Sequence, residues 1–274
     1  MATEPAAASA RKLRIALLQM KVTAGDPDEN YRRAGDMLRE AVAGGEKPDV
    51  ILLPEMWNTG YALERIRELA DEGGERTGRF IGDFCRRHGV NVIAGSIADK
   101  TGGRVRNTAY AFDRAGRLTA DYSKIHLFRL MDEEKHLAAG GKPGLLSVDG
   151  QPAGLIICYD LRFPELTRRL ALEGAKILFV PAEWPNPRLH HWRSLIIARA
   201  IENQMYVIAC NAVGENGGNT FFGHSMIVDP WGTIVAEAGE EETILTAEVD
   251  LALADDVRAK IPVFEDRRPE LYGL

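Results

Sequence analysis

Three residues of the sequence have side chains that can together hydrolyse an amide: Glu55, Lys124 and Cys158. Each follows a run that is typical of a strand end, namely residues 50–53, 117–123 and 152–157. If these strands share a sheet and run the same way, the three side chains meet at its carboxyl edge, where open α/β sheets usually carry their sites. The spacing therefore predicts one site built from three distant segments.

The chemistry of such a site follows from the three residue types. A thiol with an ordinary pKa is only a few per cent thiolate at neutral pH, so Cys158 needs a base, and the Glu55 carboxylate can take its proton. Attack on an amide carbonyl places negative charge on the oxygen. The Lys124 ammonium and the backbone N–H after the cysteine can stabilise that charge, and one such donor is worth about 10²–10³ in rate.

Each of these residues also has an ordinary structural interpretation. Most free cysteines are small buried hydrophobic residues, a lone glutamate can cap a turn, and a lone lysine is usually solvated. The shared placement of all three at strand ends favours catalysis. Cys85, on an apolar helix face, and Cys210, in a buried strand, have no acid or base beside them in sequence, so we interpret both as packing residues.

The surrounding pattern predicts strands that alternate with helices and hairpins, which favours mixed sheets covered by helices in one compact domain. We predict helices over residues 27–43, 63–71, 78–88, 164–173, 190–204 and 251–260. We predict strands over residues 13–20, 50–53, 91–97, 105–113, 117–123, 145–148, 152–157, 176–180, 205–211, 220–228, 233–237 and 242–249. Pro181 is expected to stop a strand, residues 125–143 to be irregular, and the tail from residue 261 to be extended.

Composition excludes several classes of function. The chain has 274 residues with 45% apolar and 27% charged content and a net charge of −6, which argues against nucleic-acid binding and against docking on anionic lipid. Three cysteines without CxxC spacing predict neither a disulfide framework nor a zinc site. Residues 1–10 lack a signal-peptide pattern and read as a flexible tail, and no apolar run is long enough to span a membrane. We expect a cytoplasmic protein.

Three segments carry a resemblance to a known family. Leu53-Pro54-Glu55-Met56, Lys124-Ile125-His126-Leu127-Phe128 and Cys158-Tyr159-Asp160-Leu161-Arg162-Phe163-Pro164-Glu165 resemble the signature segments of the nitrilase superfamily, the carbon–nitrogen hydrolases. The similarity runs from about residue 13 to about residue 250. It implies an α/β fold, a four-layer αββα sandwich with two mixed sheets, formed by a single domain over residues 11–274. It also implies pairing into an αββα–αββα homodimer or a larger homo-oligomer.

The resemblance also assigns roles to residues. It implies Glu55 as general base, Lys124 as oxyanion stabiliser and Cys158 as nucleophile, with the Tyr159 backbone N–H as second oxyanion donor. It implies a further glutamate in the loop after the lysine, where the spacing to Gly140 favours Glu133 and leaves Glu134 open. It implies no metal and no organic cofactor.

Within the superfamily, the chain most resembles the omega-amidase branch. The segments that carry this are His126-Leu127-Phe128-Arg129, Glu183-Trp184-Pro185, His191-Trp192 and Ala198-Arg199-Ala200-Ile201-Glu202-Asn203-Gln204. Such enzymes hydrolyse the terminal amide of small 2-oxo acid amides of the 2-oxoglutaramate and 2-oxosuccinamate type. Three sister activities remain as alternatives: N-carbamoyl amino acid hydrolase, aliphatic amidase and nitrilase. A non-catalytic binding or redox-sensing relative is a more remote alternative.

These substrates are anions, so the pocket should hold a cation besides Lys124. Arg129 and Arg188 lie on loops near the expected mouth, and either can grip a carboxylate through two parallel hydrogen bonds, although each can equally be a surface residue. Tyr61 and Trp184 are candidate pocket walls, with ordinary loop packing as the alternative. We expect Arg162 to pair with Glu165 and brace the turn after the cysteine rather than to contact substrate.

Overall fold

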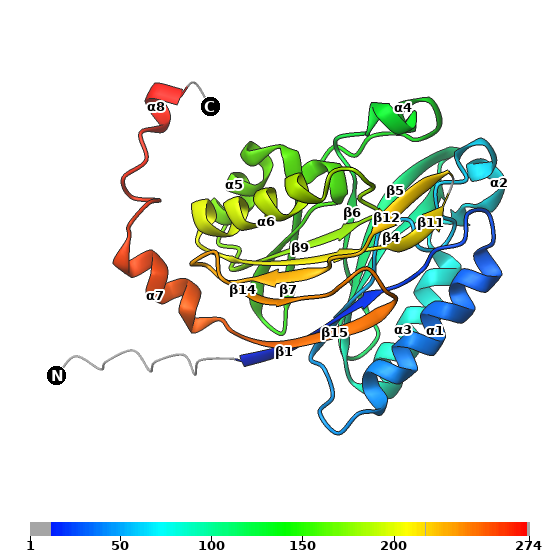
Figure 1. Ribbon diagram of the computed structural model, residues 1–274, viewed down its shortest axis with the longest axis horizontal. Coiled ribbons are helices and arrows are strands. Elements are labelled where there is room, and N and C mark those ends of the chain that lie inside the picture. The colour runs from blue at the N-terminus through cyan, green and yellow to red at the C-terminus, as the bar shows by residue number, and fades with distance from the viewer. Residues whose placement is uncertain (1–11, 217, 273–274) are drawn as a thin grey trace.

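The computed structural model describes residues 12–216 and 218–272. The tail predicted for residues 1–10 lies outside this part of the chain. Figure 1 shows two sheets packed face to face, with helices on their outer sides.

The first sheet is mixed, in the order β15-β1-β2-β4-β5-β6, with the short β3 paired to β4. Its strands β1, β2 and β4 run parallel, and β15, β5 and β6 join them through antiparallel pairs. The bounds are β1 Lys12–Gln19, β2 Val50–Leu52, β3 Asp71–Glu72, β4 Asn91–Thr101, β5 Arg104–Phe112, β6 Leu118–Ser123 and β15 Thr243–Asp250.

The second sheet is also mixed, in the order β14-β13-β10-β9-β8-β7, with β8, β9 and β10 parallel at its centre. A separate hairpin is formed by β11 and β12. The bounds are β7 Gly144–Val148, β8 Gln151–Leu155, β9 Ile177–Ala182, β10 Tyr206–Asn211, β11 Val213–Asn216, β12 Asn219–Phe222, β13 Met226–Val228 and β14 Ile234–Glu237.

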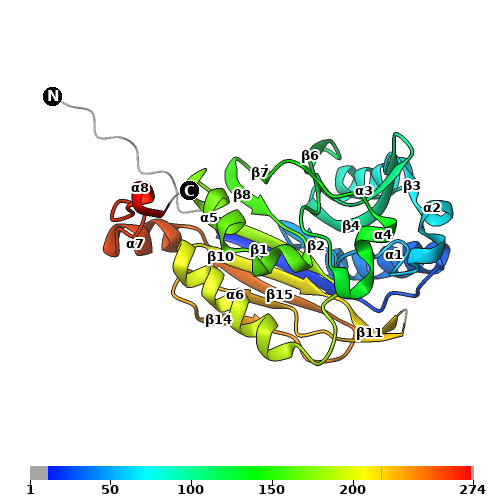
Figure 2. The same cartoon turned by 90° about the horizontal axis from the view of Figure 1, so that it is seen from above.

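Helices cover the outer face of each sheet (Figures 1 and 2). The α1 and α3 helices lie on the first sheet, and α5 and α6 lie on the second. The helices and helical turns are α1 Pro27–Ala43, η1 Leu63–Arg65, α2 Ile66–Leu69, α3 Glu75–His88, η2 Arg129–Met131, α4 Glu133–His136, η3 Cys158–Arg162, α5 Pro164–Leu172, α6 Leu189–Asn203, α7 Ala252–Lys260 and α8 Pro269–Tyr272.

The apolar run in β1 explains the layering. Ile15 and Leu17 pack in the cluster between the sheets, whereas Ala16 and Leu18 pack in the cluster beneath α1. Successive side chains of a strand point to opposite faces, so a strand that is buried on both faces reads as a continuous apolar run. The result is the αββα sandwich that the family resemblance implied.

Helix signals in the sequence located α1 accurately. The helix begins at Pro27, as predicted, and the Asp26 side chain caps it by accepting a hydrogen bond from the Glu29 N–H at 3.1 Å. The prediction for α3 began too late, because Gly78 lies inside the helix rather than at its start.

Several strand predictions were wrong. The strand expected over residues 220–228 is interrupted between β12 and β13, because Gly223 and His224 both adopt positive φ, which no regular strand accommodates. The β9 strand continues through Pro181, which pairs in register with Cys210 of β10. The pattern also missed β11, the short helical turns within residues 125–143, and α8 in the tail.

Among the described residues, no helix has the length and apolarity that crossing a membrane would require.

Candidate active site

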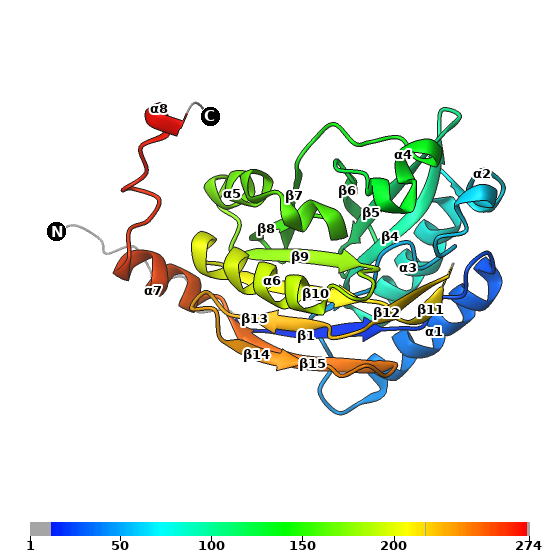
Figure 3. The same ribbon diagram turned by 45° about the horizontal axis from the view of Figure 1, so that its top comes forward.

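Four strand ends build the site, β2 and β6 from the first sheet and β8 and β9 from the second. Figure 3 shows the two sheets from which these strands come. Glu55 and Lys124 follow β2 and β6 of the first sheet, which point the same way because two antiparallel pairings separate β6 from β4. Cys158 and Glu183 follow β8 and β9, which are parallel strands of the second sheet. The expectation that three strand ends share one sheet was therefore wrong: Cys158 comes from the sheet opposite the one that carries Glu55 and Lys124.

Lys124 lies at the centre of the charged groups. Its Nζ donates to Glu55 Oε1 at 2.8 Å and to Glu133 Oε1 at 2.6 Å, and all three side chains are buried. Glu55 is held further by the Asn107 side-chain amide at 2.8 Å and by the Glu183 backbone N–H at 2.8 Å. The carboxylate is thus fixed by donors from both sheets.

A chain of hydrogen bonds also fixes Glu133. Its Oε1 accepts from the Tyr61 hydroxyl at 2.7 Å, and its Oε2 accepts from the Phe128 backbone N–H at 2.8 Å. Glu133 is fully buried, whereas Glu134 is exposed. Of the two glutamates that the sequence left open, the structure brings only Glu133 to the lysine.

Cys158 stands on a sharp turn at the first residue of η3. Its φ of 45° lies in the left-handed region that a non-glycine residue rarely adopts, and such strain is often found at functional sites. Asp160 holds the turn by accepting hydrogen bonds from the Ile157 N–H at 3.0 Å and the Tyr122 hydroxyl at 2.7 Å. It also accepts from the His126 N–H at 3.0 Å, which connects the turn to the segment after Lys124.

The electrostatics keep the thiol protonated at rest. Burial, followed by the nearby Glu55 carboxylate, raises the pKa of Cys158 well above its usual value, and Lys124 offsets this only in part. Burial disfavours the charged Lys124, but Glu133 and Glu55 outweigh it and raise the lysine pKa well above its usual value. A Cys158 thiol that acts as a nucleophile therefore needs a base at the moment of attack, and the lysine stays cationic.

Sequence reasoning missed Glu183. The side chain is 1% exposed and lies beside the same pocket, with both carboxyl oxygens near Asn216 Nδ2, at 3.1 and 3.3 Å. Burial, followed by Glu55, raises its pKa well above the usual range. The signal was present in sequence, because Glu183 follows a buried strand as Glu55 does. It was missed because Pro181 was taken to end that strand.

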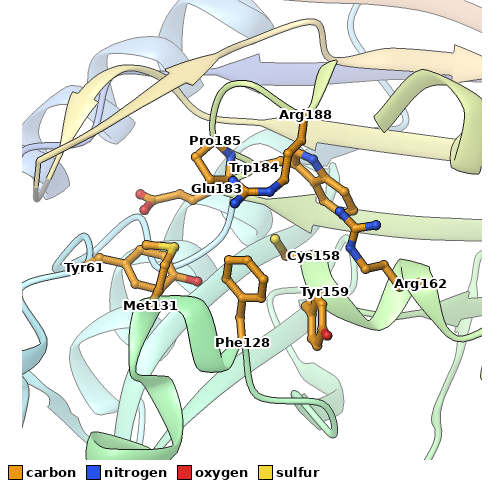
Figure 4. Close-up of a pocket in the computed structure, with 10 residues that line it drawn as sticks. All are labelled: Tyr61, Phe128, Met131, Cys158, Tyr159, Arg162, Glu183, Trp184, Pro185 and Arg188. Carbon is orange, nitrogen blue, oxygen red and sulfur yellow. The ribbon is translucent and has the colours of Figure 1, made fainter. Parts of the chain in front are cut away.

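A narrow pocket that is partly open to solvent leads to Cys158. Figure 4 shows the sulfur near its centre, with Phe128 and Tyr159 on one side and Trp184 on the other. The full lining is Tyr61, Phe128, Met131, Cys158, Tyr159, Arg162, Glu183, Trp184, Pro185 and Arg188. Cys158 thus lies in a small cleft whose walls combine four aromatic rings with two arginines.

The substrate-binding candidates fall into two groups. Tyr61, Trp184 and Arg188 line the pocket, but Arg129 is exposed and lies along a neighbouring groove instead. Arg162, which the sequence assigned to a brace, also lines the pocket, with its guanidinium 4.7 Å from the centre of the Trp184 ring.

Comparison with known proteins agrees with this fold and site. The family model described as carbon-nitrogen hydrolase matches residues 14–259. The chain therefore belongs to the carbon–nitrogen hydrolase family, the nitrilase superfamily, and within it to the omega-amidase branch.

Individual relatives match over nearly their whole length. The chain is 46% identical to the 2-oxoglutaramate amidase of Bacillus subtilis over 95% of this chain and 100% of that protein. It is 34% identical to omega-amidase NIT2 of Homo sapiens, covering 95% and 97% of the two chains. Among solved structures, Nit3 of Saccharomyces cerevisiae superposes with a TM-score of 0.87 at 30% identity, covering 94% and 97%.

Proposed function

We propose that this protein is a thiol amidase that hydrolyses the terminal amide of small 2-oxo acid amides, of the 2-oxoglutaramate and 2-oxosuccinamate type. The relatives named 2-oxoglutaramate amidase and omega-amidase, which match nearly the whole chain, support this substrate class. The observation that carries the reaction type is the buried Lys124 bridge between Glu55 and Glu133 beside the Cys158 thiol.

Acylation begins when the Cys158 sulfur attacks the amide carbonyl carbon while its proton passes to Glu55. Negative charge then develops on the carbonyl oxygen, where the Lys124 ammonium and the Tyr159 backbone N–H stabilise it. The tetrahedral intermediate collapses as Glu55 returns the proton to the nitrogen. The C–N bond breaks, ammonia leaves, and the acyl group remains on Cys158 as a thioester.

Deacylation uses the same groups. Water attacks the thioester carbonyl and gives a proton to Glu55, and the same oxyanion donors stabilise the second tetrahedral intermediate. The C–S bond breaks, the acid product leaves, and the sulfur recovers its proton from Glu55. Glu133 accepts a second hydrogen bond from Lys124 and so positions the ammonium for the carbonyl oxygen, and Tyr61 fixes Glu133 in turn.

We propose further that residues 11–274 form one domain, which pairs through α5 and α6 into a homodimer in the cytoplasm. Two large apolar side chains on these helices are exposed in the single chain, Leu172 at 46% and Ile201 at 51%. Exposed apolar surface on adjacent helices is typical of a face that another subunit covers.

A panel of substrates tests the proposed reaction. We expect the wild-type protein to release ammonia from 2-oxoglutaramate with a kcat/KM at least about 100-fold above that for N-carbamoyl-β-alanine or 4-cyanobutanoate. Release of carbon dioxide together with ammonia from the carbamoyl compound as the preferred reaction would identify a carbamoylase instead. Preferred turnover of the nitrile would identify a nitrilase.

A further inference from the structure

The pocket around Cys158 has two sides of opposite charge. On one side Glu183 lines the pocket, and next to it the Glu55 and Glu133 carboxyl groups share the single cation Lys124, so acidic groups outnumber cations there. The other side carries the guanidinium groups of Arg162 and Arg188 (Figure 4). Such a field orients a ligand whose ends differ in charge.

Arg162 is fixed relative to the nucleophile. It ends η3, the helical turn that Cys158 begins, and its guanidinium stacks 4.7 Å from the centre of the Trp184 ring. Its Nη2 lies 3.3 Å from His191 Nδ1, and no carboxylate among the described residues pairs with it. Burial lowers the pKa of this half-buried arginine. Tyr159 and Cys158 raise that pKa in part, and the Arg188 charge lowers it further.

Arg188 is a second cation on the same side of the pocket. Its Nη1 donates only a long hydrogen bond, 3.3 Å, to the Asn186 carbonyl, and its guanidinium lies 5.7 Å from the centre of the Phe128 ring. No carboxylate within residues 12–216 and 218–272 pairs with it either. The Arg188 charge helps to lower the pKa of Arg162, so the two cations repel each other, and a bound anion removes that repulsion.

A third donor adjoins the two arginines. Trp184 is 2% exposed, and its Nε1–H has no hydrogen-bond partner among the described residues. A buried donor left unpaired costs free energy, which a ligand acceptor can recover. The indole lies in the pocket wall between the two guanidinium groups (Figure 4).

We propose that Arg162, supported by Arg188 and the Trp184 N–H, binds the carboxylate of the substrate and makes the enzyme selective for amides of anionic acids. The identity of that substrate rests on the proposed function, whereas the anion site rests on the pocket alone. The planar guanidinium matches a carboxylate through two parallel hydrogen bonds. With the carboxylate held there, the uncharged amide end extends past Cys158 toward the carboxyl side of the pocket.

The first experiment measures selectivity in an Arg162→Gln variant. The ratio of kcat/KM for 2-oxoglutaramate to kcat/KM for pentanamide, a neutral amide of equal chain length, is expected to fall about 100-fold. The ratio cancels any general loss from a disturbed turn, because such a loss lowers both values alike. Arg162→Lys keeps the positive charge but loses the planar pair of N–H donors, so its ratio should lie between those of the wild type and Arg162→Gln. An unchanged ratio in Arg162→Gln would overturn the proposal.

The second experiment separates the anion site from the proposed substrate. Calorimetric titration with 2-oxoglutarate should show binding to the wild-type protein and about 100-fold weaker binding to Arg162→Gln. The control is Arg87→Gln, which removes an exposed arginine on α3 and should bind as wild type does. If the wild type binds this anion through Arg162 but does not hydrolyse 2-oxoglutaramate, the proposed function fails and the anion site stands. Equal binding by wild type and Arg162→Gln would refute the anion site.

Discussion

At the scale of single residues, the proposed reaction depends on Cys158 and Glu55, because the thiol is both buried and close to the Glu55 carboxylate. Both features raise its pKa, so the site does not store a thiolate as a cysteine beside a histidine cation does. Lys124 cannot replace the base, because it is cationic and already shared by two glutamates. In the proposed mechanism the proton therefore moves to Glu55 during the attack.

Replacing Glu55 by Gln should move two measurements in opposite directions. The substitution removes a negative charge beside the thiol, so the pKa of Cys158 should fall and iodoacetamide should alkylate it at lower pH than in wild type. Ammonia release should nevertheless fall about 10²–10⁴-fold, because the base is gone. Peptide mapping identifies which cysteine is alkylated. Cys85 should stay unmodified, because burial raises its pKa to about 12. Faster alkylation accompanied by undiminished turnover would refute the role of Glu55 as base.

Glu183 should make stability depend on pH. Its raised pKa means that the folded protein keeps a proton that the unfolded chain releases above about its ordinary value of 4.5. As pH rises from there toward the folded-state pKa, the unfolded state binds fewer protons than the native state, so the free energy of unfolding falls. Glu183→Gln removes this loss and should be more stable than wild type by about 1 kcal/mol or more at pH 8.

Urea unfolding of Glu183→Gln and wild type at pH 5 and pH 8 measures this effect. The advantage of the variant should be clearly larger at pH 8. Glu215→Gln, on the exposed side of the neighbouring β11, is the matched control and should show no such dependence. An advantage of equal size at both pH values would mean that Glu183 is ionised in the folded protein.

At the scale of elements, Asp160 connects the two sheets at the site. It is fully buried, and it joins the turn of η3 to Tyr122 of β6 and to the His126 backbone N–H, with His126 Nδ1 at 2.7 Å. The imidazole in turn stacks on the Phe163 ring at 3.6 Å. The segments that carry Lys124 and Cys158 are therefore fixed relative to each other by one carboxylate.

Asp160→Asn should lower both stability and activity. The amide places an NH₂ group against donors that the carboxylate accepted, so we expect a loss of about 3 kcal/mol or more in the free energy of unfolding. Tyr122→Phe removes one of these hydrogen bonds and should cost only about 1 kcal/mol. Chemical denaturation of both variants checks the difference. Equal losses in the two variants would contradict a role for Asp160 as the central acceptor.

The element scale also explains what the sequence could predict. Strand patterns that end at Glu55, Lys124 and Cys158 located the catalytic candidates, because strand periodicity is a local signal. These local signals could not predict which strands belong to which of the two sheets, because strand pairing depends on contacts between distant segments. Likewise, Arg129 and Arg162 are both arginines on turns near the site, and only the packing of η3 against the loop after β9 brings Arg162 into the pocket.

At the scale of the whole molecule, the sandwich leaves α5 and α6 with apolar side chains toward solvent. These helices follow the cysteine turn and the loop that carries Trp184 and Arg188, so the proposed interface adjoins both walls of the pocket. Pairing there would stabilise the segments that shape the site.

Sedimentation equilibrium tests the proposed assembly. The wild-type protein should have twice the chain mass of 30.2 kDa at micromolar concentration. Ile201→Asp places a charge on α6 and should shift the distribution toward single chains, whereas Leu118→Asp, at an equally exposed position of β6, should not. A wild-type protein that sediments as a single chain would contradict the dimer.

The most direct test of the central claim is to stop the reaction with 2-oxoglutaramate after less than one turnover and to measure the intact mass of the protein. The account predicts one added acyl group on Cys158, formed together with one equivalent of ammonia, and neither product in Cys158→Ala. Ammonia release from 2-oxoglutaramate by Cys158→Ala at the wild-type rate, or an acyl group on a different residue, would contradict it.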